Sequence, residues 1–353
     1  MAYIDPAWES IKGFKTHEFL VYSAYYDVRK RSEPIIRVIG VTRAKHPEKV
    51  TCRIFYDNEK STSKSKYTQT HSNLTKGIEL LVPFLDVHGA VSLLDLGFSK
   101  DKPYYHPCYI ICPLNHTKFT NFKNLPIPVS VSIAPMSSTN LSLTKKFQVI
   151  NAKNGGTGTY SAPKNDIALC VKPIHTNYNN WVELFSFIEL NKILGVSKII
   201  VYNESMSKDI SCVLEYYSTQ EHFISVLAWD LFEKSNISTD RMRNRGVQSS
   251  LNDCFYRNMN EYKYIFSVDL DEFIIPHMHE TIPEMLEYLT SADINFLDSH
   301  WRQKKAMKNV QNVSNPNVIT SYNFKNALFY QHYGKRYFLC MVSEFITSRH
   351  KKY

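Results

Sequence analysis

Residues 264–273 read Tyr-Ile-Phe-Ser-Val-Asp-Leu-Asp-Glu-Phe, a mostly apolar run that leads directly into two aspartates. A short apolar run of this kind predicts a buried β-strand. Side chains alternate along a strand, so Asp269 and Asp271 would share one face if the strand continued. Where the strand ends and the chain turns, the two carboxylates can converge on one ion.

Two carboxylates this close repel each other unless a counter-charge lies between them. A divalent cation resolves the repulsion, and hard oxygen ligands suit Mn²⁺ or Mg²⁺ that is shared with a substrate diphosphate. Asp269 and Asp271 are therefore the predicted metal ligands. An acidic surface turn without a function is the alternative, and the apolar flanks 264–268 and 273–275 argue against it.

A second class of enzyme also places two aspartates at the end of a strand. Phosphatases of the haloacid-dehalogenase type use the first aspartate as a nucleophile and the second as an acid. Their pattern requires Thr or Val soon after the second aspartate. Glu272 and Phe273 stand there instead, which argues against this class.

The region around this stretch alternates between predicted strands and helices. Apolar strands are expected at 167–171, 198–202, 223–227 and 264–268, with helices between them at 181–194, 213–217 and 241–260. This order predicts a mostly parallel sheet that is covered by helices. Ligands of such sheets bind beyond the carboxyl ends of the strands. Asn203 and Glu204 follow the second strand and are predicted to contact a bound nucleotide sugar there, although a plain turn explains them equally well.

The helix before the two aspartates carries a polar stripe. At about 100° per residue, one face collects Arg245, Gln248, Ser249, Asn252 and Tyr256. A cation, two amides and hydroxyls in a row suit sugar hydroxyls and phosphate oxygens. Arg245, Gln248 and Asn252 are therefore predicted to bind a nucleotide sugar. A solvent-exposed helix face is the alternative.

The first part of the chain has a different character. Residues 1–150 hold apolar and aromatic stretches between turn residues, which predicts a small β-rich domain, an antiparallel sheet or sandwich. The Gly-rich segment that follows lacks the Gly-Lys-Ser/Thr of a phosphate-binding loop, so 151–165 are predicted to be a linker. The expected fold class is α/β, with a helix-covered, mostly parallel sheet over 166–353 after the small β-rich domain.

The composition is that of a globular protein and excludes several classes. Of 353 residues, 43% are hydrophobic and 21% are charged, which rules out a mainly disordered chain. The net charge is +9, but the basic residues are scattered in pairs and triplets, so a nucleic-acid partner is not expected. We expect no membrane span and no secretory signal. Sequons favour a lumenal protein only weakly in this Asn-rich chain; they begin at Asn73, Asn115, Asn140, Asn203, Asn236 and Asn312.

Taken together, these residues resemble glycosyltransferase family 92. The match rests on an ordered set of stretches, namely 21–27, 36–40, 170–174, 181–184, 194–196, 245–257 and 268–276. The resemblance implies a GT-A catalytic domain that uses Mn²⁺ (or Mg²⁺) and a UDP-sugar donor, UDP-galactose. It implies inverting transfer of the galactose to a glycan or glycoprotein acceptor, with Asp269 and Asp271 as the metal and nucleotide motif. Family members are usually anchored in the Golgi membrane, so the expected place is the Golgi or secretory pathway, with any anchor outside this chain.

The last part of the chain departs from that pattern. Only 77 residues remain after Pro276 (353 − 276), fewer than the family normally has there, so a C-terminally shortened domain is expected. Inversion needs a carboxylate that takes the proton of the acceptor hydroxyl. Asp298 is the candidate because it follows a possible strand at 294–297; a helix-cap or turn carboxylate is its alternative reading. The alternative function is an inactive, truncated relative that binds glycans.

Overall fold

The structure is a computed structural model that divides into two compact units. One comprises Met1–Ile188 and Ser197–Asp271, and the other comprises Glu189–Val196 and Glu272–Tyr353. The predicted linker lies outside the described residues except for Asn165, and so do Asp298 and the strand expected at 294–297. The structure describes residues 7–11, 13–14, 19–29, 33–43, 49–56, 84–94, 105–114, 127–136, 145–150, 165–235, 237–291, 322–323 and 346–347.

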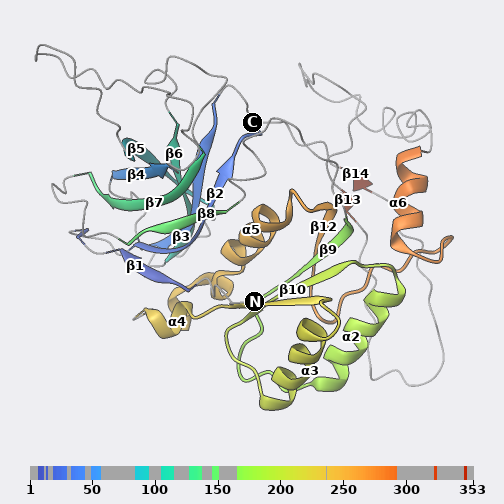
Figure 1. Cartoon of the computed structure of the whole chain (residues 1–353). Coiled ribbons are helices and arrows are strands. Elements are labelled where there is room, and N and C mark those ends of the chain that lie inside the picture. The colour runs from blue at the N-terminus through green and yellow to red at the C-terminus, as the bar shows by residue number, and fades with distance from the viewer. Residues whose placement is uncertain are drawn as a thin grey trace, which may run out of the picture. The chain divides into compact units, whose positions relative to one another are not determined.

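The larger sheet of the first unit closes into a barrel (Figure 1). Its strands are β1 (Glu9–Ile11), β2 (Phe19–Asp27), β3 (Ile35–Thr42), β4 (Val50–Tyr56), β5 (Phe84–Leu93), β6 (His106–Pro113), β7 (Pro128–Pro135) and β8 (Phe147–Ile150). They follow the order β1-β2-β3-β6-β5-β4-β7-β8, and β8 pairs again with β2. The strands from β2 to β8 alternate in direction, and their number is odd. The closing pair must therefore be parallel, as β2–β8 is.

A bulge in β2 changes which side chains point into the barrel, so that this strand contributes residues to two hydrophobic cores. The register with β3 shifts between Val21 and Ser23. Before the shift Val21 points into the barrel, and after it Ala24 does, so the alternation of side chains moves by one residue. Tyr22 and Ser23 both face outward as a result, and Tyr22 joins the aromatic core around Trp229. This explains why every residue of β2 is buried.

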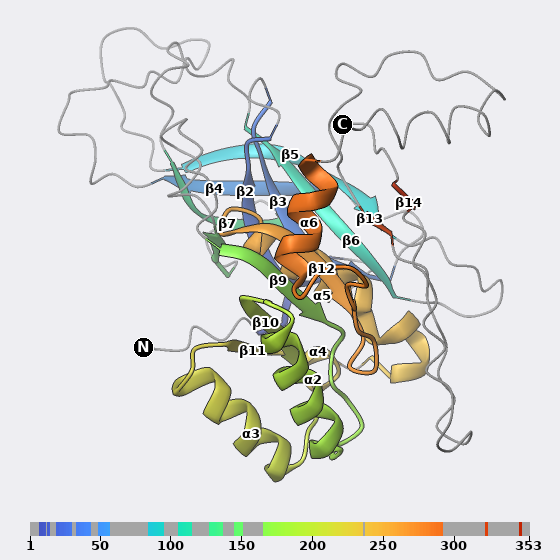
Figure 2. The ribbon, with the colours of Figure 1, turned by 90° about the vertical axis from the view of Figure 1, so that its right-hand side faces the viewer.

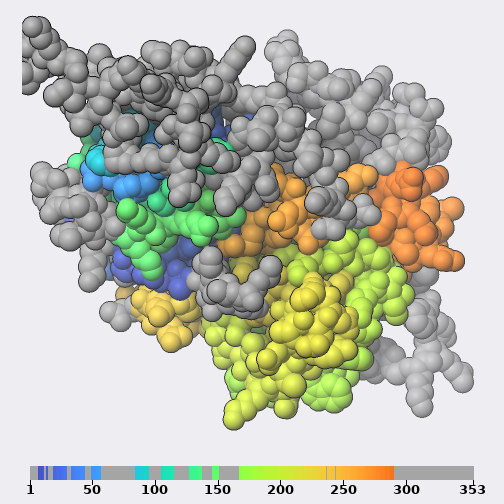
Figure 3. Space-filling model, viewed as in Figure 1, coloured from blue at the N-terminus to red at the C-terminus, as the bar shows by residue number. Residues whose placement is uncertain are grey.

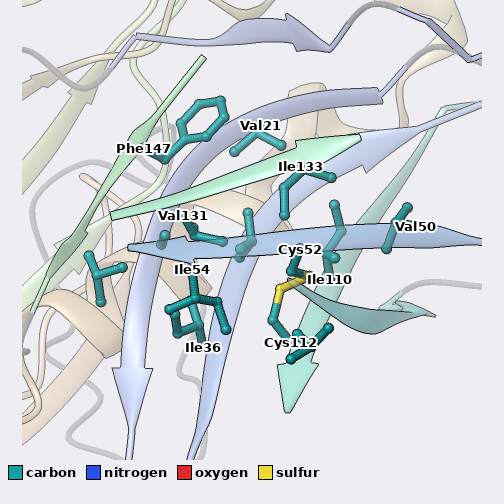
Figure 4. Packing of buried hydrophobic residues seen from close by; sticks show 14 of the residues in the cluster. Val21, Ile36, Val50, Cys52, Ile54, Ile110, Cys112, Val131, Ile133 and Phe147 are labelled. Atoms are coloured by element: carbon teal, nitrogen blue, oxygen red, sulfur yellow. A yellow bond between two sulfur atoms is a disulfide. The ribbon is translucent and has the colours of Figure 1, made fainter. Parts of the chain in front are cut away.

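The interior of the barrel is filled mostly by aliphatic side chains, together with aromatic ones such as Phe147 and a disulfide (Figure 4). Cys52 on β4 and Cys112 on β6 are bonded although β5 lies between their strands. Gly89 on β5 leaves the room for this bridge. A Cβ atom at Gly89 would lie 2.8 Å from the sulfur of Cys52 and 2.7 Å from Cγ2 of Val50, closer than packed atoms approach.

The first unit also contains a four-stranded parallel sheet with the order β11-β10-β9-β12. Its strands are β9 (Asn165–Val171), β10 (Lys198–Asn203), β11 (Ile224–Ala228) and β12 (Tyr262–Val268). The connecting helices are α2 (Trp181–Ile193), α3 (Lys208–Thr219), α4 (Leu231–Lys234) and α5 (Val247–Asn258), with 3₁₀ turns at Thr239–Arg241 and Arg243–Gly246. Residues 181–188 of α2 lie with α3 on one side of this sheet (Figure 2). Helix α3 lies at the surface in Figure 3. Its Tyr216 is exposed.

Helix α5 packs between the barrel and the parallel sheet (Figure 1). It contacts β2, β3 and β6 of the barrel, and β9 and β12 of the sheet. A second disulfide joins Cys254 of α5 to Cys170 of β9. On the barrel side, Asp253 accepts hydrogen bonds from Ser23 and Tyr25, both at 2.5 Å. The helix is therefore held to both sheets by strong, specific contacts.

The second unit is described mainly through α6 (Ile282–Ser291) and two short strands, β13 (Tyr322–Asn323) and β14 (Ile346–Thr347), which pair antiparallel. The amide of Ile282 donates to the carbonyl of Leu194 at 2.9 Å. Gly195 has a φ of +85° and lies against Pro283. A side chain there would be strained and would meet the proline ring at 2.9 Å.

The expected fold class was wrong. The α/β class predicted a helix-covered, mostly parallel sheet after a small antiparallel sheet or sandwich. The structure instead has a closed barrel as its largest sheet, and in the described part more residues lie in strands than in helices. Apolar and aromatic stretches predict several of the barrel strands, but they do not show that β8 returns to pair with β2. That pairing joins residues over a hundred positions apart (Ala24 and Val149), which local patterns do not encode.

None of the helices in the described part of the chain has the length and apolar character that crossing a membrane requires.

We expect the Cys170–Cys254 disulfide to contribute about 2 to 4 kcal/mol to the free energy of unfolding. The bridge closes a loop across a sequence separation of 84 residues, which limits the freedom of the unfolded chain. Replacing both cysteines by alanine avoids an unpaired thiol. Urea unfolding of the double variant should show a lower midpoint, with a slope equal to or steeper than that of the wild type because the unfolded chain without the bridge is less compact. A midpoint equal to that of the wild type would contradict this role.

Candidate functional site

The carboxyl ends of β9, β10 and β12 meet at one edge of the parallel sheet. β12 pairs with β9 so that Val268 lies opposite Val171. The next residues, Asp269 and Lys172, are therefore neighbours, and the Lys172 Nζ lies 2.6 Å from the Asp269 Oδ2. Both side chains are partly exposed, at 47% for Lys172 and 31% for Asp269. The register of two strands thus brings a cation onto the first aspartate.

A second ion pair lies at the end of β10. Glu204 follows Asn203, the last residue of that strand, and accepts a hydrogen bond from Arg245 Nε at 2.9 Å and another from Arg245 Nη2. β9 separates β10 from β12, so the ends of these two strands lie about 10 Å apart. The two ion pairs therefore belong to the same sheet edge.

The chain adopts an unusual conformation to bring Arg245 to this place. Asn244 and Arg245 have φ values of 46° and 52°, and Gly246 has 80°. Left-handed conformation in non-glycine residues costs roughly 1 kcal/mol or more each. The indole of Trp229 donates to the Arg245 carbonyl at 3.1 Å, and the Trp229 amide donates to the Asn203 carbonyl at 2.8 Å. Trp229 thus ties the left-handed turn to the end of β10.

The segment after β9 adds a third polar group. Its backbone runs beside β10, because the Ile174 amide donates to Tyr202 and the Glu204 amide donates to Ile174. Further on, the Tyr178 hydroxyl donates to Glu183 Oε2 at 2.6 Å. Partial burial, this hydrogen bond and the negative charges of Glu183 and Asp271 raise the pKa of Tyr178. Tyr178 therefore stays protonated within electrostatic reach of Asp271.

Five of the predicted site residues lie at the edge of the parallel sheet. Asp269 lies beside Lys172, Asp271 is exposed, and Glu204 is joined to Arg245. Asn203 is partly buried, and its Oδ1 accepts no hydrogen bond from the described residues. All five lie at or near the carboxyl ends of the strands.

The other polar residues of α5 face elsewhere. Gln248 is exposed, and its backbone carbonyl accepts a hydrogen bond from the side-chain Nδ2 of Asn252 at 2.6 Å. The Asn252 Oδ1 accepts a hydrogen bond from Tyr109 of the barrel. Ser249 Oγ lies 3.4 Å from the Gly40 carbonyl, and Tyr256 accepts a hydrogen bond from Arg29. Most of this stripe therefore packs against the barrel, and donor binding by Gln248 and Asn252 stays a prediction.

The two aspartates fit a particular kind of cation site. In the described part of the chain, no group of three or more His, Cys, Asp or Glu side chains could hold an ion by itself. Mg²⁺ and Mn²⁺ commonly take one or two carboxylates and complete their shell with water and substrate phosphates. Asp269 and Asp271 offer this donor set. The residues present are compatible with an ion that is shared with a diphosphate, and not with an all-protein cage.

Sequence reasoning missed Lys172, Tyr178 and Glu183. Lys172 follows the last residue of β9 directly, so the rule that identified Asp269 at the end of β12 also applies to it. No sequence signal identifies Tyr178 and Glu183, because they meet only through the turn that starts α2.

Two comparisons connect the chain to known proteins. The family described as Glycosyltransferase family 92 matches residues 165–342, about half of the chain. A stretch of 184 residues is 28% identical to "Beta-1,4-galactosyltransferase galt-1" of Caenorhabditis elegans. This similarity covers 50% of the chain and 39% of the relative, so the matched part corresponds to well under half of that protein.

Proposed function

Because the chain belongs to glycosyltransferase family 92, we propose that it moves a hexose, galactose from UDP-galactose, onto a glycan or glycoprotein acceptor. The proposed transfer depends on Mn²⁺ or Mg²⁺ and inverts the anomeric centre, which makes a β-linked product. The similarity to a β-1,4-galactosyltransferase supports the choice of sugar.

One observation carries the proposal. Asp269 and Asp271 leave the carboxyl end of β12 at the sheet edge where Lys172 and the Glu204–Arg245 pair also lie. A nucleotide sugar needs cations for its diphosphate and polar groups for its ribose and base. Asp269 and Asp271 can hold a divalent ion for the diphosphate, and Lys172 and Arg245 supply further positive charge.

Each candidate residue has a separate role in the proposed reaction. Asp269 and Asp271 would hold the divalent ion, which neutralises the charge that develops on the departing UDP. Arg245 is positioned by Glu204 for the phosphate or ribose side of the donor. Asp298 is proposed to take the proton of the acceptor hydroxyl, which an inverting mechanism requires.

The two disulfides support a place in the secretory pathway. Cys52–Cys112 and Cys170–Cys254 are buried bonds that form and persist in oxidising compartments. We propose the Golgi lumen or membrane as the site of action, since glycan transfer takes place there in the family that the chain resembles.

Calorimetric titration with UDP tests the donor site. We expect the wild type to bind UDP in the presence of Mn²⁺ and much more weakly without it. Asp271→Ala should weaken the Mn²⁺-dependent binding about tenfold or more, a loss of about 1.4 kcal/mol, because one carboxylate ligand is removed. Asp209→Ala, an exposed carboxylate in the first turn of α3, is the matched control and should bind as the wild type does.

Two results would contradict the proposal. One is the absence of UDP binding by folded wild type at any Mn²⁺ concentration. The other is equal affinity of wild type and Asp271→Ala. If binding is found, the transfer of galactose from UDP-galactose is compared with that of glucose and N-acetylglucosamine from their UDP donors, and a preference for another sugar would overturn the choice of galactose.

A further inference from the structure

Lys172 and Asp269 form an ion pair that a divalent cation would have to disturb. The Lys172 ammonium lies 2.6 Å from the Asp269 Oδ2, on the carboxylate that the proposed function assigns to the metal. A cation bound to Asp269 would meet the positive charge of Lys172 at close range. At this range the two positive charges repel each other, so metal binding to Asp269 favours a lysine that has turned away from that carboxylate.

We propose that Lys172 exchanges partners during donor binding. In the donor-free protein its ammonium neutralises Asp269, and when a divalent ion takes Asp269 the ammonium moves to the diphosphate of the nucleotide. This inference rests on the proposed function and assigns a further donor-binding residue to the same site. Lys172 is thus a phosphate ligand that also balances the charge of Asp269 before the metal binds.

The environment of Lys172 permits the exchange at low cost. With about half of its side chain exposed, Lys172 can leave Asp269 without burying an unpaired charge. Ion pairs at this degree of exposure contribute about 0 to 1 kcal/mol, so little stability is lost when the pair opens. A lysine suits this task because its ammonium is a compact charge on a flexible four-carbon stem.

The anchoring of the lysine limits where it can turn. Val171 and Pro173 on either side of it are buried, and the Ile174 amide bonds to the Tyr202 carbonyl at 2.8 Å. The backbone of Lys172 is therefore held at the sheet edge, while its side chain is about half exposed and has room to change rotamer. By changing rotamer, its ammonium can reach the space beyond the strand ends. A diphosphate that shares a metal with Asp269 and Asp271 would lie in that space.

The sum of charges at the site explains why a lysine is useful at position 172. Asp269 and Asp271 carry two negative charges, and Lys172 leaves one net negative charge in the donor-free site. A divalent ion and a diphosphate diester with two negative charges add no net charge to this sum. Without Lys172, the complex would carry one further negative charge next to the departing UDP, which disfavours both donor binding and leaving-group departure.

Two binding measurements on Lys172→Met test the proposal. UDP affinity in the presence of Mn²⁺, measured by calorimetry, should fall about tenfold because a charge-assisted contact is lost. Affinity for Mn²⁺ alone, measured from the free-ion signal by electron paramagnetic resonance, should rise about threefold because a competing cation is removed. The opposite signs of the two changes separate an exchanging lysine from one that merely supports the fold.

Two further variants complete the design. Lys172→Arg keeps the charge and should retain UDP affinity within about threefold of the wild type. Lys263→Met is the control, because Lys263 is an exposed lysine near the start of β12 and lies roughly 20 Å from Asp269 along that strand. This change should alter neither affinity. Thermal unfolding of all variants should agree with the wild type within a few degrees.

The outcomes distinguish this inference from the proposed function. If the wild type does not bind UDP with Mn²⁺, the proposed function fails and this inference fails with it. If the wild type binds and Lys172→Met binds UDP equally well, only the inference is overturned. Weaker binding of Mn²⁺ alone by Lys172→Met would also overturn it, since that result makes Lys172 a support for the metal site and not its competitor.

Discussion

Replacement of Asp269 by asparagine is expected to lower the kcat of the proposed galactose transfer by about 10²- to 10³-fold. Asparagine has nearly the same shape, so the change removes the charge and little else. A neutral amide is a poor ligand for a divalent ion, and the charge that develops on the departing UDP then lacks its main counter-charge. Steady-state kinetics at saturating UDP-galactose and Mn²⁺ measure the effect.

The stability of this variant should change little. Asp269 and Lys172 are both partly exposed, and such pairs contribute at most about 1 kcal/mol. Unfolding curves of the variant and the wild type should therefore nearly coincide. Asp86→Asn, on a carboxylate that pairs with Arg53 on the outer face of the barrel, is the control and should keep full activity. Activity of Asp269→Asn within tenfold of the wild type would exclude Asp269 as a metal ligand.

The second large effect is expected at Asp253, a carboxylate with no exposure to solvent. It accepts hydrogen bonds from Ser23 and Tyr25 of the barrel, from Tyr202 of β10 at 2.7 Å, and from Arg257 at 3.0 Å. Burial raises the pKa of Tyr25 and of Tyr202, so both hydroxyls keep their protons and remain donors. One side chain on α5 thus joins both sheets of the first unit.

Asp253→Ala should lower the free energy of unfolding by about 5 kcal/mol, at the upper end for a broken buried ion pair. The loss leaves Arg257 without its carboxylate and several buried hydroxyls without an acceptor. Urea unfolding followed by circular dichroism measures the change. If the variant does not fold well enough, Tyr202→Phe removes a single hydrogen bond and should cost about 1 kcal/mol.

The matched control for Asp253 is Asp86, which also forms a bidentate pair with an arginine. Asp86 is 37% exposed, whereas Asp253 is fully buried. Asp86→Ala should therefore change the free energy of unfolding by less than about 1 kcal/mol. Similar losses in the two variants would show that burial and the additional donors around Asp253 do not matter, and would contradict its role as the contact between barrel and sheet.

Tyr202 also gives Asp253 a connection to the candidate site. Asn203 and Glu204 follow Tyr202 directly along β10. The hydrogen bond from Tyr202 to Asp253 therefore holds the strand that carries these two residues. A folded Tyr202→Phe variant is the suitable protein for asking whether this contact affects donor binding as well as stability.

Helix α5 shows where sequence reasoning reached its limit. The sequence predicts one polar face on a helix over 241–260, but α5 begins at Val247 and Arg245 lies before it. A helical pattern also does not state which neighbour a face meets. In the structure Asn252 and Tyr256 contact Tyr109 and Arg29 of the barrel, while Arg245 alone turns to Glu204. The left-handed turn at Asn244 and Arg245 causes this division, and nothing in the residue types predicts it.

The sequence by itself determined the local elements and the family. Apolar runs predicted the strands that are present as β9, β10, β11 and β12, and the two aspartates after β12 were found because a strand end is visible in the order of residues. The resemblance to glycosyltransferase family 92 is confirmed over residues 165–342. These features depend on neighbours in the chain, which one sequence contains in full.

Only the tertiary structure decided how distant segments pair. The parallel contact of β8 with β2 closes the barrel, the cysteines pair across separations of 60 and 84 residues, and the register of β9 with β12 sets Lys172 on Asp269. Each of these contacts depends on the packing of the whole unit, because many pairings of strands satisfy the same local pattern. Burial and register select one of them, and that selection is made when the chain folds.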